Sequence, residues 1–328
     1  MNSKAVGINS PAASAIGQPL PPIIAEAPSV RRVPFGLGFM FRRKKQKKNL
    51  RTGEIAVLWG SRLIIWIFAI LILIPGVWVV ATSFQPGDLY FGGLLPNGFT
   101  LDHYRTLFQG TLFLTYIRNS VLVCTTVGVA TVALVATMAY AFSRFRFSGR
   151  KYGLMGLLII QMFPAQMSFI AYKLLLSHLP ISGVDTLWGY TLCMIGGGLP
   201  FNAWLFKGYI DSLPADLEEA AYVDGATKFQ AFRRIILPLT RPMMAVVFIF
   251  VWFGIYNDYI IASYILPTDT NWTVTLGLKG LSEGAGSFAS DWTLFAAGAT
   301  IASIPLLLVF LSMQRFLVSG LSRGAVKG

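Results

Sequence analysis

Charged side chains are scarce in this sequence. Only 12% of the 328 residues are Asp, Glu, Lys or Arg, whereas soluble domains carry roughly 25%. Hydrophobic residues make up 55% of the chain. This balance argues against a soluble enzyme or binding domain. It predicts an all-α membrane protein with several transmembrane helices.

Cysteine and histidine are also scarce, with two of each. Cys124 and Cys193 fall in apolar runs, so we expect small buried hydrophobic residues and no disulfide framework. His103 and His178 have no cysteine or carboxylate cluster at ligand spacing, so no metal site is predicted. No nucleophile-elbow, Walker or Rossmann string occurs either. We therefore predict that this chain carries no catalytic residues and binds no cofactor.

Acidic residues are outnumbered by basic ones, 14 against 27, which gives a formal net charge of +13. A charge of this size could indicate nucleic acid, but its distribution follows membrane topology. With the N-terminus inside, only four basic residues fall on the external side: Arg105, Arg118, Lys173 and Lys279. The positive-inside rule then places both termini in the cytoplasm. We expect a lipid bilayer as the partner and no nucleic acid.

Long apolar runs are abundant. A helix that crosses the hydrocarbon core of a bilayer needs about 20 mainly apolar residues. Six runs qualify: Leu63–Ala81, Val121–Phe142, Gly153–Leu176, Leu187–Phe206, Met243–Ile265 and Leu294–Phe316. The sequence therefore predicts six transmembrane helices within residues 55–328.

Residues 1–54 precede these runs and are rich in proline and alanine, with a basic cluster at Arg42–Lys48. We expect a disordered cytoplasmic tail whose basic cluster lies against anionic lipid. A specific partner for the cluster is the alternative. The tail is not a secretory signal, because the first apolar run begins only near Leu63 and is too long.

A polar loop at residues 211–242 separates the fourth and fifth runs. Pro214 suits the first turn of a helix, and Gly225 can end that helix in a left-handed conformation. Thr227 and Gln230 form a capping box that starts a second helix. An apolar stripe is expected along this second helix: Phe229, Phe232, Ile235 and Ile236. Two proline residues are expected to break the path into the fifth run: Pro238 and Pro242.

This loop predicts a pair of short helices hinged at Gly225, a shape that can enter a groove on a partner. Small Ala220 and Ala221 would permit close approach by another backbone. The alternative is an interfacial loop that only links two spans.

Polar groups interrupt several of the apolar runs. Gln161, Pro164 and Gln166 interrupt the third, and Gly196–Pro200 is expected to interrupt the fourth. Irregular backbone at this depth requires cover from protein or a water-filled cavity. Four side chains are candidates to line a hydrated translocation path: Gln161, Gln166, Asn202 and Asp258. Interhelical hydrogen bonding and close packing are the alternative.

The loop also carries a longer pattern: Glu219-Ala220-Ala221, three residues, Gly225, nine residues, then Ile235-x-Leu237-Pro238. It resembles the EAA loop of the membrane subunits of ABC importers. From about residue 55 onward the chain is similar to the smaller membrane subunit of bacterial maltose/maltodextrin importers, within the carbohydrate-importer permease family. The similar strings are Ala139–Phe142 with Arg144–Phe147, Gln161–Ala165, Glu218–Thr227, Gln230–Arg233, Leu237–Leu239, Gly320–Ser322 and Val326–Gly328.

This resemblance implies an ABC type I importer permease fold in the bacterial inner membrane. It implies pairing with a second permease subunit, two cytosolic ABC ATPase subunits that use ATP and Mg, and an extracytoplasmic sugar-binding protein. The outer loop 266–291 would reach toward the binding protein, and residues 320–328 would insert between the ATPase subunits. The implied ATPase-coupling residues are Glu218, Glu219, Ala220, Ala221, Asp224, Gly225, Leu237 and Pro238.

The expected function is import of maltose or maltodextrin-type sugars by ATP-driven alternating access. Import of another oligosaccharide or of glycerol-3-phosphate is an alternative within the same class. An ion-coupled secondary carrier is a different class, typically marked by internal repeats and paired intramembrane charges. A non-transporting membrane scaffold is a further alternative, which would tolerate disruption of the Gly225 hinge.

Overall fold

The computed structural model describes residues 52–87, 98–162, 165–179, 183–283 and 292–324, with no side-chain description at 52–56, 165–166, 283 and 317–324. The chain divides into two units, Met1–Ser61 and Arg62–Gly328. The first unit contributes only the described start of helix α1. Nearly all of the expected N-terminal tail, residues 1–54, therefore lies outside the described residues, as do outer-loop residues 284–291.

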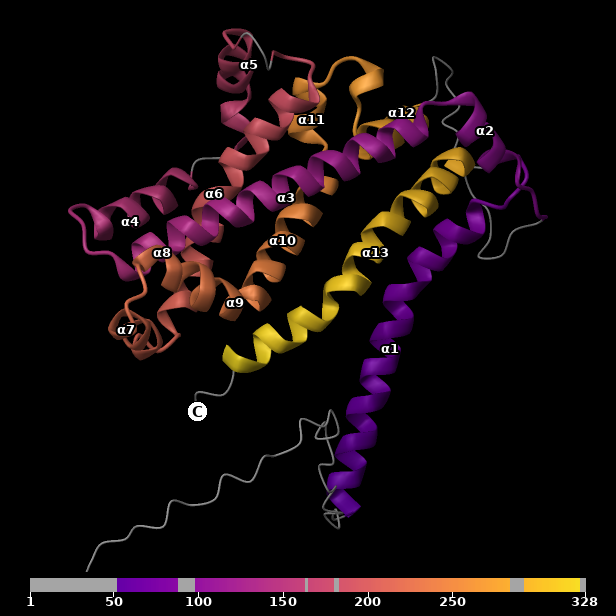
Figure 1. Ribbon diagram of the computed structural model, residues 1–328. Helices are drawn as coiled ribbons and strands as arrows, with labels where there is room; N and C mark the ends of the chain where they lie inside the picture. The colour runs from indigo at the N-terminus through magenta and orange to yellow at the C-terminus, as the bar shows by residue number, and fades with distance from the viewer. Residues whose placement is uncertain (1–51, 88–97, 163–164, 180–182, 284–291, 325–328) are drawn as a thin grey trace, which may run out of the picture. The chain divides into compact units, whose positions relative to one another are not determined.

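Every regular element in the described ranges is helical, and these ranges contain no strand (Figure 1). The elements up to the polar loop are α1 Thr52–Thr82, α2 Asp102–Gly110, α3 Phe113–Arg144, α4 Arg150–Ile160, η1 Ala165–Ser168, α5 Phe169–Ser177 and α6 Leu187–Asp211. Those that follow are α7 Asp216–Val223, α8 Lys228–Ala231, the π-helical turn η2 Phe232–Ile236, α9 Leu237–Leu239, α10 Arg241–Tyr256, α11 Ile260–Ile265, η3 Asp269–Asn271, α12 Val274–Glu283 and α13 Trp292–Gly324.

Three helices of the described chain are long and apolar enough to cross a membrane: Val57–Thr82, Phe113–Arg144 and Trp292–Phe316. A fourth joins them if the bent pair Lys228–Leu239 and Arg241–Tyr256, which meet at 71°, counts as one span. These helices cover the first, second, fifth and sixth expected runs at least in part. The count of six spans stays a prediction.

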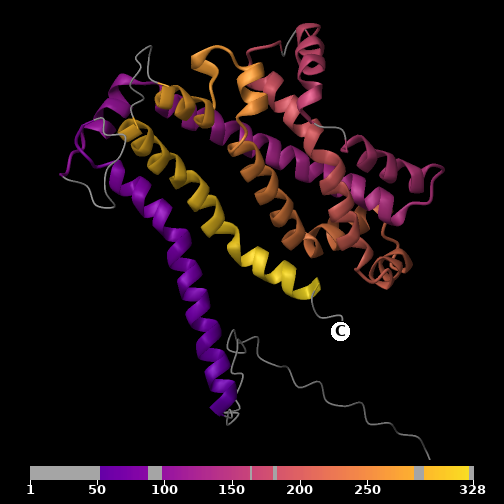
Figure 2. The same cartoon turned by 180° about the vertical axis from the view of Figure 1, so that it is seen from behind.

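Helix α3 organises the packing of the second unit. It packs along α6 and α10, and α10 packs in turn against α13 (Figures 1 and 2). At Gly128 of α3, an added Cβ would lie 2.8 Å from the Phe248 ring of α10. Glycine at this position thus allows the two helices to approach closely, as small residues do between membrane helices. The buried aromatic residues Tyr190 of α6 and Trp252 of α10 complete the core around α3.

Polar positions break two of the expected spans and leave a third intact. The third run divides into α4, η1 and α5 around Gln161, as the sequence predicted. The predicted interruption of the fourth run is wrong, because α6 continues through Gly196–Gly198 and Pro200 as one helix. Proline removes only one backbone donor, and packing of α6 along α3 stabilises the helix on either side of it.

The fifth run breaks at Asp258, between α10 and α11. Its Oδ2 accepts a 2.8 Å hydrogen bond from the buried Tyr190 hydroxyl and a 2.9 Å bond from the amide of Ala262. The carboxylate therefore caps α11 and satisfies a buried hydroxyl of α6. This pairing accounts for a carboxylate between two segments of an apolar run.

The segment that follows α11 is anchored to the N-terminal part of α3. The Asn119 side-chain amide donates 3.1 Å hydrogen bonds to the carbonyls of Thr270 and Trp272. The Val274 amide donates a 2.7 Å bond to the Ser120 hydroxyl. Three consecutive polar contacts thus fix the path of this segment up to α12.

We expect Asp258→Ala to lower the free energy of unfolding by about 1–3 kcal/mol, because the buried Tyr190 hydroxyl loses its acceptor. The measurement is thermal unfolding of the purified protein in detergent. Asn257→Ala is the matched control, since that exposed side chain bonds only to the Phe253 carbonyl of its own helix. Equal unfolding temperatures for the two variants would show that the Asp258 contacts contribute nothing.

Candidate functional site

The candidate site is the coupling segment, which we define as residues 212–240 between α6 and α10. Helix α7 begins with acidic residues in its first turn, where the helix dipole favours them. It ends at Gly225, whose φ of +82° is the predicted left-handed conformation. The amide of Ala226 donates to the Ala221 carbonyl at 2.9 Å, and that of Gly225 to the Tyr222 carbonyl at 3.0 Å. These paired bonds form a Schellman motif, which fixes the end of α7.

The second helix of the coupling segment starts at the predicted capping box. The Gln230 amide donates to the Thr227 hydroxyl at 3.2 Å, and the Thr227 amide donates to the Gln230 side chain at 2.8 Å. The helix then widens into the π-helical turn η2 and ends at Leu239. The 71° bend before α10 follows, so the path changes direction between Pro238 and Pro242, as predicted.

The coupling segment exposes most of the residues that the sequence nominated. Glu219, Ala220, Asp224, Gly225 and Pro238 are exposed. Two further nominated residues are half-buried: Ala221 and Leu237.

Two large apolar side chains are exposed beside these polar and small residues. Val223 is 88% exposed and Phe229 is 68% exposed. The predicted apolar stripe is therefore divided: Phe232 and Ile236 are buried, while Phe229 faces outward. Sequence periodicity placed Phe229 correctly on a helix but did not indicate which part of the stripe is buried, and it did not single out Val223.

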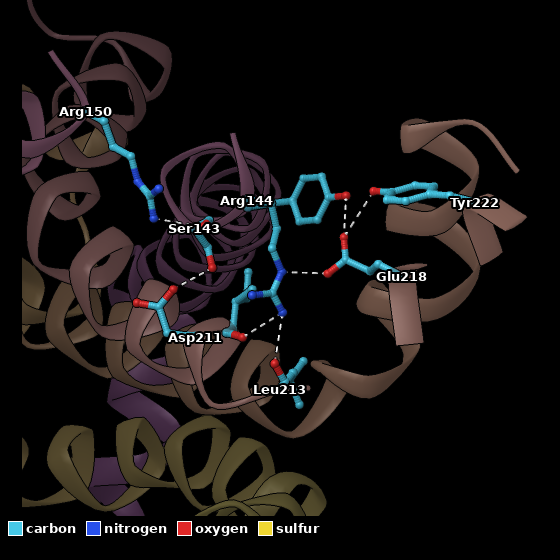
Figure 3. A network of polar contacts seen from close by, with 9 residues as sticks. Ser143, Arg144, Arg150, Asp211, Leu213, Glu218 and Tyr222 are labelled. Atoms are coloured by element: carbon cyan, nitrogen blue, oxygen red, sulfur yellow. Dashed lines mark hydrogen bonds and ion pairs between the residues drawn. The ribbon is translucent and has the colours of Figure 1, made fainter. Parts of the chain in front are cut away.

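Glu218 is the exception in the nominated set, because it is buried with only 3% of its surface exposed. Its Oε1 accepts a 2.6 Å hydrogen bond from Arg144 Nε, which makes a buried ion pair (Figure 3). Its Oε2 accepts a 2.8 Å bond from the Tyr140 hydroxyl and a longer one, 3.4 Å, from Tyr222. The carboxylate is therefore satisfied on both oxygens by side chains of α3 and α7.

Arg144 also contacts the end of α6. Its Nη2 donates to the carbonyls of Ile210 at 3.2 Å and Leu213 at 3.0 Å, as Figure 3 shows for Leu213. These carbonyls lie at the C-terminus of α6, where a cation is favoured. In the sequence, Tyr140 and Arg144 stood out only as members of strings that resemble the permease family. Their contacts with Glu218 and with the end of α6 were not predicted.

A second link joins α3 to α6 beside the ion pair. The Ser143 hydroxyl donates a 2.5 Å hydrogen bond to Asp211 (Figure 3). Asp211 also forms an ion pair with Lys207. Burial alone would raise the pKa of the Asp211 carboxyl, but the hydrogen bonds from Lys207 and Ser143 outweigh burial and lower its pKa. Arg150 of α4 donates to the carbonyls of Phe142 and Ser143 and closes the end of α3.

The pathway-lining candidates do not gather at one place. The Gln161 side chain is exposed and donates a 3.4 Å hydrogen bond to the Gly197 carbonyl of α6. Asn202 is buried and donates to the Gly198 carbonyl at 2.7 Å, and its Oδ1 has no hydrogen-bond partner among the described atoms. Gln161 and Asn202 thus both donate hydrogen bonds to carbonyls of the glycine run in α6. Asp258 lies elsewhere, at the break between α10 and α11. The side chain of Gln166 lies outside the described residues.

Comparison with known proteins matches residues 131–323 to the family described as binding-protein-dependent transport system inner membrane components. The galactooligosaccharides transport system permease protein GanQ of Bacillus subtilis is 39% identical over 272 residues, which are 82% of this chain and 95% of GanQ. The maltodextrin transport system permease protein MdxG of the same organism is 35% identical, over 85% of this chain and 100% of MdxG.

A similar relative is the maltose/maltodextrin transport system permease protein MalG of Vibrio vulnificus, 35% identical over 83% of this chain and 96% of MalG. Among solved structures, a chain of a bacterial ABC transporter that imports the acidic polysaccharide alginate has a TM-score of 0.70. It is 22% identical, and the match covers 81% of this chain and 98% of that chain. At this identity the structural likeness shows that the two chains share a fold. The family assignment rests on the family match and the sequence relatives.

We expect Thr227→Ala to destabilise the start of α8 by about 1 kcal/mol, because the Gln230 amide loses its side-chain acceptor. Thr227→Ser keeps the hydroxyl and is the matched control. Amide hydrogen exchange over Lys228–Ala231 in the purified protein measures the effect. Equal exchange in the two variants would mean that the capping box does not hold this turn.

Proposed function

Because the chain belongs to the family of binding-protein-dependent transport system inner membrane components, we propose that it is the permease subunit of an ABC importer that carries maltose or maltodextrin-type sugars inward. Its relatives are permeases of sugar ABC importers. The observation that carries the proposal is the coupling segment. This segment is short, folded and firmly held to α3, yet it exposes acidic, small and apolar residues side by side.

Those outward residues suit a groove on a partner protein. Val223 and Phe229 provide apolar surface whose exposure to water is unfavourable, and Glu219 adds a negative charge. Ala220 permits close approach of another backbone. We propose that two cytosolic ABC ATPase subunits bind at this type of surface, one on this chain and one on a second permease subunit. ATP and Mg are used by those ATPases.

The proposed mechanism is alternating access. Closure of the ATPase pair moves the docked coupling segment, which closes the inner gate and opens the outer gate of the two permease subunits. Such coupling requires an assembly with two states, one open inward and one open outward. Both ATP binding at the ATPases and sugar binding at the permease must shift the equilibrium between these states. The proposal includes six spans in the bacterial inner membrane, both termini in the cytoplasm and a sugar-binding protein on the opposite side.

The particular sugar is the finer part of the proposal. Relatives of similar identity carry the names of galactooligosaccharide, maltodextrin and maltose systems. Maltose or maltodextrin is our first choice because of the string Gln161–Ala165 and the C-terminal Val326–Gly328. Uptake of labelled maltose, maltotriose and a galactooligosaccharide by the reconstituted importer decides among these. Glycerol-3-phosphate uptake tests the remaining alternative, and sugar uptake without any ATPase would indicate a secondary carrier.

We expect Glu219→Lys and Gly225→Pro each to abolish co-purification of the ATPase, or its stimulation by sugar, while the chain stays in the membrane. The first variant reverses an exposed charge on the docking surface. The second forces a residue with φ near −65° into a position that needs +82°. The measurement is ATPase retention on the tagged chain and sugar-stimulated hydrolysis by the reconstituted complex.

Asp269→Lys is the matched control, because it reverses an exposed acidic charge in the outer segment, far along the chain from the coupling segment. It should leave ATPase retention unchanged. Normal binding and stimulation in Glu219→Lys and Gly225→Pro would overturn the docking assignment and favour the scaffold or carrier alternatives.

A further inference from the structure

Helix α7 is attached to the helical bundle in an unusual way. Of its eight residues, Glu218 alone is buried. An ordinary surface helix buries a stripe of apolar side chains and presents polar ones to water. Here Leu217 and Val223 are exposed and the anchor is a carboxylate. The non-covalent attachment of α7 to α3 therefore depends on the hydrogen bonds of one charged side chain.

That anchor is directional. Apolar contacts tolerate small rotations, because their energy depends mainly on buried area. The two oxygens of Glu218 are instead bound separately, one by Arg144 at 2.6 Å and one by Tyr140 at 2.8 Å. Charge-assisted hydrogen bonds of this kind are short and restricted in angle. They hold α7 at a fixed distance and rotation relative to the cytoplasmic end of α3.

The same two residues of α3 reach the elements on either side of α7. Arg144 donates to the carbonyls of Ile210 and Leu213 before α7. The Tyr140 ring packs on Phe232 after α8, with ring centroids 4.7 Å apart. One turn of α3 thus touches α6, α7 and η2 together.

We propose that Arg144 and Tyr140 are positioning residues that pass a displacement of α7 directly to α3 through Glu218. Helix α3 then carries the displacement to α6 and α10, along which it packs. Without this link, motion of α7 would reach the spans through the backbone at either end of the helix and through its packing on α8. The inference rests on the proposed docking of an ATPase on the coupling segment.

A purely structural role for the link has a different signature. A contact that only stabilises the fold would change how much complex assembles. A contact that transmits motion changes how much sugar is moved by each ATP, at the same amount of complex. The informative quantity is therefore the ratio of ATP hydrolysed to sugar imported, measured on the full importer in liposomes.

Glu218→Gln keeps the shape of the side chain and removes its charge. We expect this variant to raise the ratio of ATP to sugar at least about fivefold, in the range of ordinary coupling between sites. Tyr140→Phe removes one hydroxyl and should raise the ratio about two- to fivefold. Lys207→Gln is the matched control, because it breaks the nearby Lys207–Asp211 pair without touching Glu218, and its ratio should stay unchanged.

Unchanged ratios in both Glu218→Gln and Tyr140→Phe would overturn the transmission role. The proposed function would then still stand if Glu219→Lys loses the ATPase in parallel. If Glu218→Gln fails to assemble, Tyr140→Phe decides: a raised ratio supports transmission and an unchanged one overturns it. An unmodified chain that binds no ATPase would refute the proposed function, and this inference with it.

Discussion

A single buried carboxylate, that of Glu218, determines how the ends of α3 and α6 and the coupling segment are arranged. Its two oxygens bind Arg144 and Tyr140, and Arg144 in turn binds the carbonyls that end α6. The position of α7, the end of α6 and the turn η2 are therefore all set by contacts with one turn of α3. This turn thereby positions the exposed face of the coupling segment, which we propose as a docking surface.

Removal of a charged pair from water is costly, and apolar residues of similar volume often stabilise a fold as well or better. The pair in this protein is satisfied on every oxygen of Glu218, which limits that cost. What a charged pair supplies that apolar packing does not is a defined distance and angle. That property matters at the junction of three helices that the sequence otherwise connects through short turns. Asp258 likewise joins two elements through one carboxylate, which caps α11 and accepts a hydrogen bond from the Tyr190 hydroxyl of α6.

Local features of the coupling segment could be predicted from sequence because their interactions join residues close along the chain. The left-handed Gly225 and the capping box of Thr227 and Gln230 are of this kind. The partner of Glu218 could not be predicted, because Arg144 lies 74 residues away along the chain. The residues around Arg144 do not distinguish an ion-paired arginine from a solvated one. The exposure of Phe229 could not be predicted, because helical periodicity identifies an apolar stripe but not what covers it. The continuity of α6 was missed because glycine and proline were judged alone, without the helices that pack beside them.

The described hydrogen-bond partners of Glu218 belong to its own chain, whereas Val223 and Phe229 are exposed. Substitutions on the exposed face and substitutions in the buried link are therefore expected to affect separate properties of the molecule. The outward face must match whatever protein binds there. Tyr140, Arg144 and Glu218 must match one another and the groups of the same chain around them, so a change at one of them is expected to need a compensating change at another. A permease built in this manner could exchange the side chains of its exposed face while the framework that holds α7 stays the same.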